Sequence, residues 1–296
     1  MSDKAFKCGL VALVGLPNAG KSTLLNAMLK EKVVITSHKP QTTRNAIYGI
    51  KTTDDYQIIF VDTPGYHAGK GRLNKVMVQQ AEEAILSVDL ICVLADPNEK
   101  GGPAFRALLE KVEARGVPSI LVITSLDDRS RDDLYDAAQH LSTLSNFKQV
   151  IPISAKIDKN IDKLEELIAA ELPEAPAVFD KDEITNQPEN FLISEFIREQ
   201  VFMLLQQEVP YDTLVETERV KESDDKMEID AAIIVNRDSQ KGIVIGKNAA
   251  MIKEIGTRAR KDLETFFGIK VRLNLFVKVK NDWASKDEYL KIQGLS

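Results

Sequence analysis

Eight consecutive residues near the start of the chain have the composition and spacing of a phosphate-binding loop. Its two glycines would let the backbone turn tightly enough to point several N–H groups at phosphate oxygens. A lysine near its end would bridge the β- and γ-phosphates, and the final hydroxyl would ligate Mg²⁺. The alternative is a glycine-rich turn that only starts a helix, which the full pattern disfavours. The eight residues are Gly15, Leu16, Pro17, Asn18, Ala19, Gly20, Lys21 and Ser22.

The residues on either side of this loop predict the elements that would hold it. Residues 8–14 form an uninterrupted apolar run, which is typical of a buried strand. Leu24, Leu25 and Met28 recur at helical spacing, so we expect a helix that begins beside Thr23, with its positive end toward the phosphates. A strand, a glycine-rich turn and a helix in this order form the context that a nucleotide site requires.

A second motif with phosphate-sensing chemistry closes a later strand. Asp62 would hold Mg²⁺ through a water, and the N–H of Gly65 would contact the γ-phosphate. A tetrapeptide such as residues 62–65 is often only a turn. Its position at a strand end, downstream of Lys21, favours a phosphate-sensing role over a simple turn. Between the motifs, Thr43 could bring its hydroxyl to Mg²⁺ only when the γ-phosphate is present, which would make this loop a switch. Thr42 is the alternative for that role.

The composition is that of a soluble globular protein with room for two domains. The chain has 296 residues, of which 44% are hydrophobic and 28% are charged. No apolar stretch is long enough to span a membrane, and the start of the chain lacks the features of a signal peptide. Cys8 and Cys92 both lie in apolar runs, so we expect core residues in a reducing cytoplasm rather than a disulfide.

Charge is distributed unevenly along the chain. The formal net charge is −6, yet residues 237–291 contain 13 Lys and Arg against 7 Asp and Glu. An acidic body with a basic end indicates that this end meets a polyanion. A solvated basic face without any partner is the alternative.

The order of the predicted elements divides the chain into two domains. In residues 1–171 strands alternate with helices, which predicts an α/β domain with a mostly parallel sheet, helices on both faces and a ligand at the carboxyl ends of the strands. The Pro-rich residues 172–190 are expected to form a linker. Residues 191–296 change to an α+β pattern. We expect a helix at 191–207, strands at 214–222 and 227–238, a helix–turn–helix segment at 246–267 and a last strand at 270–280.

Three motifs together resemble the translation-factor class of P-loop GTPases. They are GxxxxGKS at 15–22, PQTTR at 40–44 and DTPG at 62–65. The PQTTR loop and the C-terminal domain are similar to the Era family of bacterial ribosome-assembly GTPases over nearly the whole chain. The resemblance implies hydrolysis of GTP to GDP and phosphate, with Mg²⁺ as cofactor. It also implies binding of the 3′ region of 16S rRNA during maturation of the 30S ribosomal subunit. We expect a cytoplasmic monomer, and loose peripheral association with the inner membrane face stays open.

The family reads the guanine base with an Asn-Lys-x-Asp motif, from which this chain departs. Asp127 is kept, and its carboxylate can accept hydrogen bonds from the N1–H and N2–H₂ edge of guanine. Thr124 and Ser125 replace the Asn and Lys, a loss that could weaken base binding by roughly 1–3 kcal/mol. The second base motif of the family is intact, so GTP is expected over ATP, and its middle N–H can reach the guanine O6. This motif is Ser154, Ala155 and Lys156. A loop that does not read guanine is the alternative.

The residue that follows the DTPG motif predicts slow intrinsic hydrolysis. Tyr66 occupies the place where well-known small GTPases carry a water-orienting Gln. In related GTPases an Asn at the place of Asn18 ligates K⁺, which would put a second positive charge beside the phosphates. Alternatively, Asn18 simply shapes the loop. His67 is more readily explained as a solvated side chain than as a general base.

The C-terminal domain resembles the KH RNA-binding module, whose signature is a GxxG turn between two helices. The turn here consists of Gly246, Lys247, Asn248 and Ala249, and alanine replaces the second glycine. Alanine at a helix start costs little, so we expect the turn still to approach a sugar-phosphate backbone. The cationic rim would be Lys241, Lys247, Lys253, Arg258, Arg260 and Lys261.

Apolar and aromatic residues of this domain allow two interpretations each. Ile243, Ile245 and Ile252 could line a groove for RNA bases, or they could belong only to the core. Trp283 could stack on a base, although capping the sheet is the stronger expectation. Two other classes of protein stay open: an RNA-binding protein whose nucleotide domain is non-catalytic or base-relaxed, and a membrane-associated regulator that uses its basic face on anionic lipid.

Overall fold

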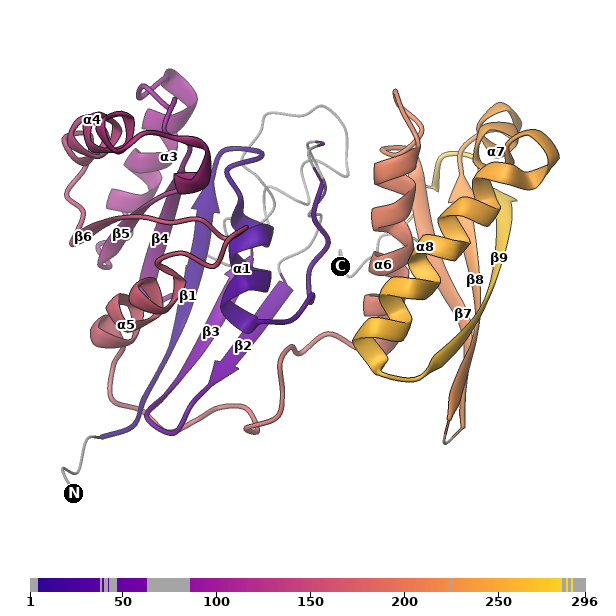
Figure 1. Ribbon diagram of the computed structural model, residues 1–296, viewed down its shortest axis with the longest axis horizontal. Helices are drawn as coiled ribbons and strands as arrows, with labels where there is room; N and C mark the ends of the chain where they lie inside the picture. The colour runs from indigo at the N-terminus through magenta and orange to yellow at the C-terminus, as the bar shows by residue number, and fades with distance from the viewer. Residues whose placement is uncertain are drawn as a thin grey trace. The chain divides into compact units, whose positions relative to one another are not determined.

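The computed structural model describes residues 5–37, 39, 42, 47–62, 86–223, 225–283, 286 and 289, and these residues form two compact units (Figure 1). Among the described residues, unit 1 comprises 5–34, 47–62 and 86–186. Unit 2 comprises the described residues from 35 to 42 and those from 187 onward. The chain therefore leaves unit 1 after Val34 for a short excursion into unit 2.

Unit 1 is built on a six-stranded sheet with the strand order β2-β3-β1-β4-β5-β6. Only β2 runs antiparallel to its neighbour, so the prediction of a mostly parallel sheet is confirmed. Every residue of β4 and β5 is buried, as expected of central parallel strands covered on both faces. The strands are β1 (Lys7–Gly15), β2 (Ile47–Thr52), β3 (Tyr56–Asp62), β4 (Leu90–Ala95), β5 (Ser119–Ile123) and β6 (Gln149–Pro152).

Four described helices cover this sheet. They are α1 (Lys21–Leu29), α3 (Pro103–Glu113), α4 (Arg131–Ser142) and α5 (Ile161–Glu171). Apolar side chains of α3 and α4 pack against one face of β1, β4 and β5. Helix α1 approaches β2 so closely that a Cβ at Gly49 would lie 2.6 Å from Leu25 Cδ1. Cys8 and Cys92 are buried free thiols, as predicted, and burial raises the pKa of Cys92 to about 12.

Residues 172–186 run along unit 1 rather than away from it. The N–H of Cys8 donates to Pro173 O at 3.1 Å, and the N–H of Ile50 donates to Ile184 O at 2.9 Å. The buried Gln57 carboxamide accepts from the N–H groups of Val178 and Phe179 at 2.8 and 3.0 Å. Its Nε2 donates to Phe179 O at 2.8 Å and to the side chain of Thr52. We call residues 172–186 the strap.

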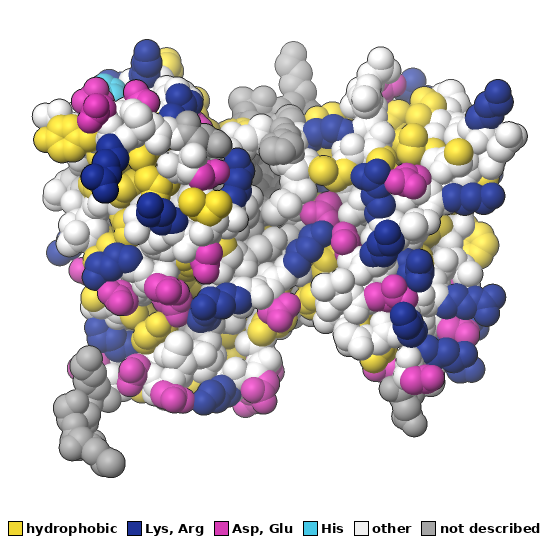
Figure 2. All heavy atoms as spheres, viewed as in Figure 1, with side chains coloured by type: hydrophobic (Ala, Val, Ile, Leu, Met, Phe, Trp, Pro, Cys, Tyr) yellow, Lys and Arg dark blue, Asp and Glu magenta, His cyan; other side chains and the backbone are white. Residues whose placement is uncertain are grey.

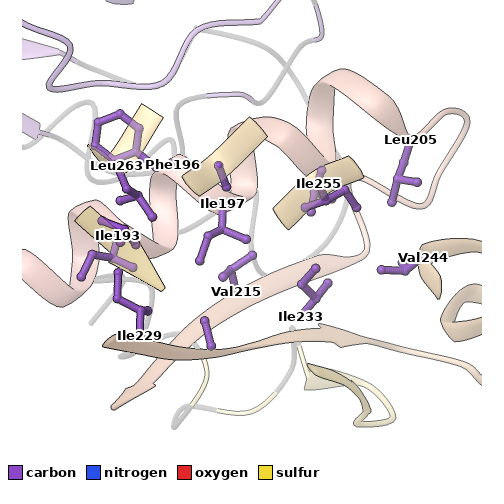
Figure 3. Packing of buried hydrophobic residues seen from close by; sticks show 14 of the residues in the cluster. Ile193, Phe196, Ile197, Leu205, Val215, Ile229, Ile233, Val244, Ile255 and Leu263 are labelled. Carbon is purple, nitrogen blue, oxygen red and sulfur yellow. The ribbon is translucent and has the colours of Figure 1, made fainter. Parts of the chain in front are cut away.

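In the part of unit 2 that the structure describes in full, a three-stranded sheet packs with α-helices α6, α7 and α8. Strand β8 pairs antiparallel with β7 and parallel with β9, and α6 and α8 pack together. Figure 3 shows Ile193 and Ile197 of α6 on the side toward Ile229 and Val215 of the sheet, whereas Phe196 lies beside Leu263 of α8. The elements are α6 (Glu189–Leu204), β7 (Thr213–Ser223), β8 (Lys226–Val235), α7 (Asp238–Ile245), α8 (Ala250–Phe267) and β9 (Lys270–Val279).

The end of the second strand and the start of the helix–turn–helix segment differ from the sequence expectation. The first helix of that segment, α7, lies before Gly246 and not after it, so the segment spans 238–267. The second strand ends at Val235 instead of continuing to residue 238, because Asp238 already begins helix α7. The carboxamide oxygen of Gln240 accepts the N–H groups of Asn236 and Arg237 at 3.1 Å each, which satisfies main-chain donors where α7 begins. The pattern of apolar residues alone did not reveal this cap.

The far face of the unit 2 sheet carries a small second core. Trp283 is fully buried there, packed in a cluster with Leu214, Ile234 and Tyr289. Its indole N–H donates to Asp212 O at 2.8 Å. The expectation that Trp283 caps the sheet is therefore confirmed. Among the residues described, no helix is long and apolar enough to cross a membrane.

Candidate nucleotide site and RNA-binding turn

The predicted phosphate loop joins β1 to α1 at the carboxyl end of the sheet. A Cβ at Gly15 would lie 2.8 Å from Leu94 O, so only glycine fits this close approach of two strands. Gly20 has φ +88°, in the left-handed region that glycine enters without strain. The N–H of Ala19 donates to Leu16 O at 3.2 Å and closes the turn. Pro17 and Thr23 complete the loop and the first turn of α1, so the eight predicted residues form one strand–turn–helix junction.

Lys21 is held inside this loop by main-chain oxygens. Its ammonium group donates to Gly15 O at 3.2 Å and to Leu16 O at 3.3 Å, and 6% of the residue is exposed. Burial lowers the pKa of Lys21 from its ordinary value, while the Asp62 carboxylate acts in the opposite direction. A polyphosphate would give this buried cation a stronger counter-charge than the two carbonyls do.

Ser22 and Asp62 bring two oxygen groups together beside the loop. The Ser22 hydroxyl donates to Asp62 Oδ2 at 2.8 Å, and Asp62 is fully buried at the end of β3. A hydroxyl and a carboxylate are the hard oxygen donors that Mg²⁺ prefers. The residues present therefore fit a magnesium ion, as the sequence predicted for this pair.

The backbone conformation of Asn18 accounts for its residue type. Its φ of +63° lies in the left-handed region, which asparagine tolerates better than most other residues. Shaping the loop is thus one role of Asn18, and K⁺ ligation stays a prediction.

Asp127 and Ser154 lie together at the ends of β5 and β6. The Ser154 hydroxyl donates to Asp127 Oδ1 at 2.5 Å, and the Lys156 ammonium is 3.6 Å from Asp127 Oδ2. The hydrogen bond from Ser154 is the main cause that lowers the pKa of Asp127, with Lys156 adding to it. Asp127 is therefore held ionised beside Ala155, as an acceptor for guanine N–H groups requires.

The two residues that depart from the family motif directly follow β5, and Thr124 lies beside the phosphate loop. The Thr124 hydroxyl donates to Ala95 O at 3.3 Å, and its methyl Cγ2 lies 3.6 Å from where a Cβ at Gly20 would be. Ser125 has φ +61°. An Asn at position 124 would offer a carboxamide to the phosphate loop, where Thr124 offers only a methyl group.

Several predicted residues lie outside the described part of the chain. Thr43 and Gly65 are the predicted switch and γ-phosphate contacts, and Tyr66 and His67 follow the second motif. Their roles stay predictions from the sequence. Thr42, the alternative to Thr43, is described and buried in unit 2.

The predicted RNA-binding turn joins α7 to α8. Gly246 has φ +71°, and a Cβ there would lie 2.7 Å from Met251 Cβ, so glycine is required. Lys247 and Asn248 are exposed at the tip, and Asn248 has φ +52°. Helix α8 (Ala250–Phe267) begins directly after the turn, so the free N–H groups of its first turn lie next to residues 246–249.

The expectation that Ala249 costs little is wrong. It rested on helix propensity, but Ala249 precedes α8 with φ +59° and ψ +23°, in the left-handed region. There the penalty comes from the clash of Cβ with the following carbonyl and is about 1–2 kcal/mol. The chain keeps the shape of the turn at this position in spite of the methyl group.

The cationic rim is divided between free and paired side chains. Lys253 lies in the first turn of α8 and is exposed, whereas Arg258 pairs with Glu254 at 2.7 Å. Arg260 pairs with Glu264 at 3.2 Å. Figure 2 shows Lys and Arg side chains interspersed with acidic ones on the visible face of unit 2. Lys247 and Lys253, which make no ion pair with a described acidic residue, lie nearest the turn.

The three isoleucines near the turn are not part of the buried core. Ile243 is 49% exposed, and Ile245 and Ile252 are half-buried. The buried cluster instead uses Val244 and Ile255 from α7 and α8. An apolar surface therefore lies beside the predicted phosphate-binding turn, and the interpretation as core alone is wrong for Ile243.

Sequence reasoning did not identify two sets of buried polar residues. Gln57 holds the strap, and Arg198 with its acidic neighbours binds residues 35–42 within unit 2. The sequence offered one signal for each set, because Gln57 stands in an apolar strand and Arg198 stands on a largely apolar helix. Their partners lie more than 100 residues away in sequence, at separations of 121 and 156.

Two family models match separate parts of the chain. Family models described as a 50S ribosome-binding GTPase and as a KH domain match residues 10–125 and 208–284. GTPase Era of Caldanaerobacter subterraneus subsp. tengcongensis is 46% identical over 292 residues, which are 98% of each chain. GTPase Era of Geobacter metallireducens is 44% identical over 296 residues, which are 99% of each chain.

Two solved structures are similar over almost the whole chain. One is Era in complex with MgGDPNP and nucleotides 1506–1542 of 16S ribosomal RNA, with a TM-score of 0.93 and 36% identity over 98% of this chain and 99% of that one. The other is a variant of Aquifex aeolicus Era bound to GDP·AlF4⁻, with a TM-score of 0.93 and 36% identity over 98% of this chain and 100% of that one. Sequence identity over nearly full length, together with the phosphate loop and the RNA-binding turn, shows that this chain belongs to the Era family of GTPases.

Proposed function

We propose that this protein is a GTP-hydrolysing switch that binds the 3′ region of 16S rRNA and assists maturation of the 30S ribosomal subunit. The observation that carries the proposal is the junction of Lys21, Ser22 and Asp62 at the carboxyl end of the sheet. The KH-type turn in the same chain supplies the RNA-binding half. The relatives named above support both halves.

In this proposal each nucleotide-site residue has a distinct task. Ser22 and Asp62 would hold Mg²⁺, which would neutralise charge on the β- and γ-phosphates. Lys21 would neutralise charge on the same phosphates, while Thr43 and Gly65 sense the γ-phosphate. Hydrolysis forms a bond from a water oxygen to the γ-phosphorus and breaks the bond to the β–γ bridging oxygen, leaving GDP, phosphate and a proton.

Guanine would be recognised by acceptor and donor groups at two strand ends. The Asp127 carboxylate would accept from N1–H and N2–H₂, and the Ala155 N–H would donate to O6. Ser154 supports this by keeping Asp127 ionised and oriented. Lys156 lies beside the carboxylate and would be near the base.

Asn18 would also ligate K⁺ and so supply a second cation next to the phosphates. Substitution Asn18→Gly separates this role from loop shape, because glycine accepts the left-handed backbone but lacks the side-chain oxygen. Stimulation of hydrolysis by K⁺ over Na⁺ should disappear while GDP affinity changes little, and unchanged K⁺ stimulation in Asn18→Gly would refute the ion role.

On the RNA side, Gly246, Lys247, Asn248 and Lys253 would bind the sugar-phosphate backbone. Exposed Ile243 beside the turn would contact bases. Arg258 would exchange its pairing with Glu254 for a phosphate. Lys247→Met should weaken RNA binding at every sequence and lower its salt dependence by about one phosphate contact.

The protein would act as a cytoplasmic monomer, and contact with the inner membrane face would be peripheral. Mass measurement in solution tests the first part, and co-sedimentation with anionic vesicles at low salt tests the second. A stable dimer would contradict the monomeric state, and absence of co-sedimentation would contradict peripheral contact with the membrane.

The deciding experiment is equilibrium binding of GDP, GTP and ATP with Mg²⁺ and K⁺ present, followed by phosphate release. We expect guanine nucleotides to bind at least a hundredfold more tightly than ATP. Equal binding of all three would indicate a base-relaxed NTPase. Absence of binding in the folded protein would leave a non-catalytic RNA-binding protein. Lys21→Met, whose length is similar but which lacks the charge, is the matched control for the phosphate site.

A further inference from the structure

Unit 2 contains a short segment of chain that precedes the Thr42–Thr43 pair. Its described residues are 35–37, 39 and 42, and they contact helix α6 of unit 2, which is the RNA module of the proposed function. Arg198 and Glu199 of α6 bond the segment, and Glu195 holds Arg198. We call Glu195, Arg198 and Glu199 the α6 clamp.

Arg198 is the centre of the clamp. It is 1% exposed, and its Nε and Nη2 donate to the two carboxylate oxygens of Glu195 at 2.6 Å each. Nη2 also donates to the main-chain oxygen of Thr42 at 2.6 Å. The guanidinium carbon lies 5.1 Å from the centre of the Phe202 ring, within cation–π range. The position of the Thr42 carbonyl is therefore set by a side chain that its own ion pair fixes.

A second pair of contacts secures the rest of the segment. Glu199 Oε1 accepts the N–H of Thr36 at 2.9 Å. In the reverse direction, the Lys39 ammonium donates to the main-chain oxygens of Phe202 and Leu205 at the C-terminal end of α6. A cation there satisfies free carbonyls and opposes the negative end of the helix. Each contact joins a charged side chain to main-chain atoms, so the attachment depends little on the other side chains of the segment.

The free energy of this arrangement favours a positioning role over simple stabilisation. The attraction between the charges of a buried ion pair is at best slightly larger than the free energy lost when both charges leave water. Apolar residues of similar volume would often stabilise the fold equally well. Among the described residues, none accepts a hydrogen bond from Arg198 Nη1, so the arrangement also leaves a donor unsatisfied. What the charges add is a fixed direction for one carbonyl.

We propose that the α6 clamp makes Arg198 a positioning residue for the GTPase switch: by fixing the main chain at Thr42, it ties the γ-phosphate-sensing loop to the RNA module. The proposal rests on the proposed function, in which the Thr42–Thr43 pair distinguishes GTP from GDP. Coupling between two ligands is reciprocal. The factor by which rRNA changes the preference for GTP over GDP therefore equals the ratio of the rRNA affinities of the GTP-bound and GDP-bound protein.

The test measures this coupling in the full chain. The affinities of a non-hydrolysable GTP analogue and of GDP are measured with and without an RNA of nucleotides 1506–1542 of 16S rRNA. In the unaltered protein we expect the RNA to change the GTP-to-GDP preference at least about fivefold. In Arg198→Met that change falls below about twofold, while GDP affinity stays the same. Arg198→Lys also loses coupling, because an ammonium cannot form the two-pronged pair with Glu195 and hold Thr42 as well.

Two further variants separate positioning from folding. Ser194→Ala is the matched control, since Ser194 is a polar residue of α6 whose hydroxyl lies 2.8 Å from that of Thr217 and forms no hydrogen bond with a described residue of the clamp or of the segment 35–42. It should keep the coupling. Lys39→Met cuts the attachment from the segment's side and should lose the coupling even if Arg198→Met fails to fold. Retained coupling in Lys39→Met and Arg198→Lys, or no coupling in the unaltered protein, would overturn the proposal. Failure of all proteins to bind GTP would instead overturn the proposed function.

Discussion

The hydroxyl of Ser154 lies 2.5 Å from Oδ1 of Asp127 and donates its proton to that carboxylate. This single contact links the ends of two neighbouring strands and is the main cause of the low pKa of Asp127. Its consequence is a carboxylate that stays charged when other carboxylates begin to take up protons, as the proposed role in guanine binding requires.

The pH dependence of GDP binding should report this contact. Asp127 accepts guanine N–H groups only when ionised, and its pKa is below the ordinary Asp value of about 3.9. Its support for binding is thus fully present above that value and is lost as the pH falls through the lowered pKa. In Ser154→Ala the pKa rises, so GDP affinity should begin to fall at a higher pH, as measured with a fluorescent GDP analogue.

Ser130→Ala is the control for this change. Ser130 donates to Asp133 at 2.7 Å in the same manner, but at the start of α4, where the pair caps the helix. Its removal should leave the pH profile of GDP binding unaltered. If Ser154→Ala gives the same profile as Ser130→Ala, the Ser154–Asp127 bond does not govern the base site.

Restoring the family residues beside Asp127 should tighten nucleotide binding. In Thr124→Asn the new carboxamide would face the phosphate loop near Gly20, and Ser125→Lys would place a long side chain beside the base. The double variant should bind GDP and GTP about 10–100 times more tightly, since one or two hydrogen bonds of roughly 1–1.5 kcal/mol each are regained. Titration calorimetry measures this, with Gln139→Lys on exposed α4 as the control for added charge. A similar gain for ATP would mean that the base is not involved.

Loss of the Gln57 carboxamide should destabilise unit 1 through the strap. Gln57→Leu keeps the volume but leaves the N–H groups of Val178 and Phe179 without their acceptor, which should cost roughly 2–4 kcal/mol of unfolding free energy. Urea denaturation measures the loss, and proteolysis within residues 174–186 should become faster. Lys181→Ala, which removes only the exposed ion pair with Asp54, should leave the urea midpoint nearly unchanged, because water and salt screen such a pair. Equal effects of both variants would contradict the role of Gln57.

The strained RNA-binding turn should respond in opposite directions to two small changes. Ala249→Gly removes a left-handed penalty of about 1–2 kcal/mol but adds about 0.5–1 kcal/mol of backbone entropy cost, so a small net stabilisation is expected. Gly246→Ala introduces a Cβ at 2.7 Å from Met251 and should destabilise unit 2 by more than about 2 kcal/mol. Thermal unfolding compares the two. Stabilisation by Gly246→Ala would show that the turn has another conformation in solution.

The sequence was most informative where main-chain geometry dictates residue type. The loop from Gly15 to Ser22, the terminal Asp62 of β3 and the mostly parallel sheet were all predicted, because tight turns and phosphate contacts require particular residues at fixed spacing. The same applies to Gly246, where only glycine fits.

Sequence patterns failed where tertiary partners decide the outcome. Arg198 and Glu199 are charged residues on a largely apolar helix, and their partners in residues 35–42 lie far away in sequence. Gln57 is likewise a polar residue in an apolar strand whose partner is the distant strap. The left-handed backbone of Ala249 likewise runs against local preference, and the shape of the whole turn imposes it. Periodicity and propensity describe only neighbours along the chain, so neither could supply these contacts.

The covered far face of the unit 2 sheet provides the chain with a built-in spectroscopic reporter. The sequence has one tryptophan, and Trp283 is fully shielded from water beside Tyr289 and bonded to Asp212. Intrinsic emission excited at the indole band therefore originates in the RNA module, whereas circular dichroism sums both units. Melting curves recorded with the two signals would separate the stability of one unit from that of the other without any label or truncation.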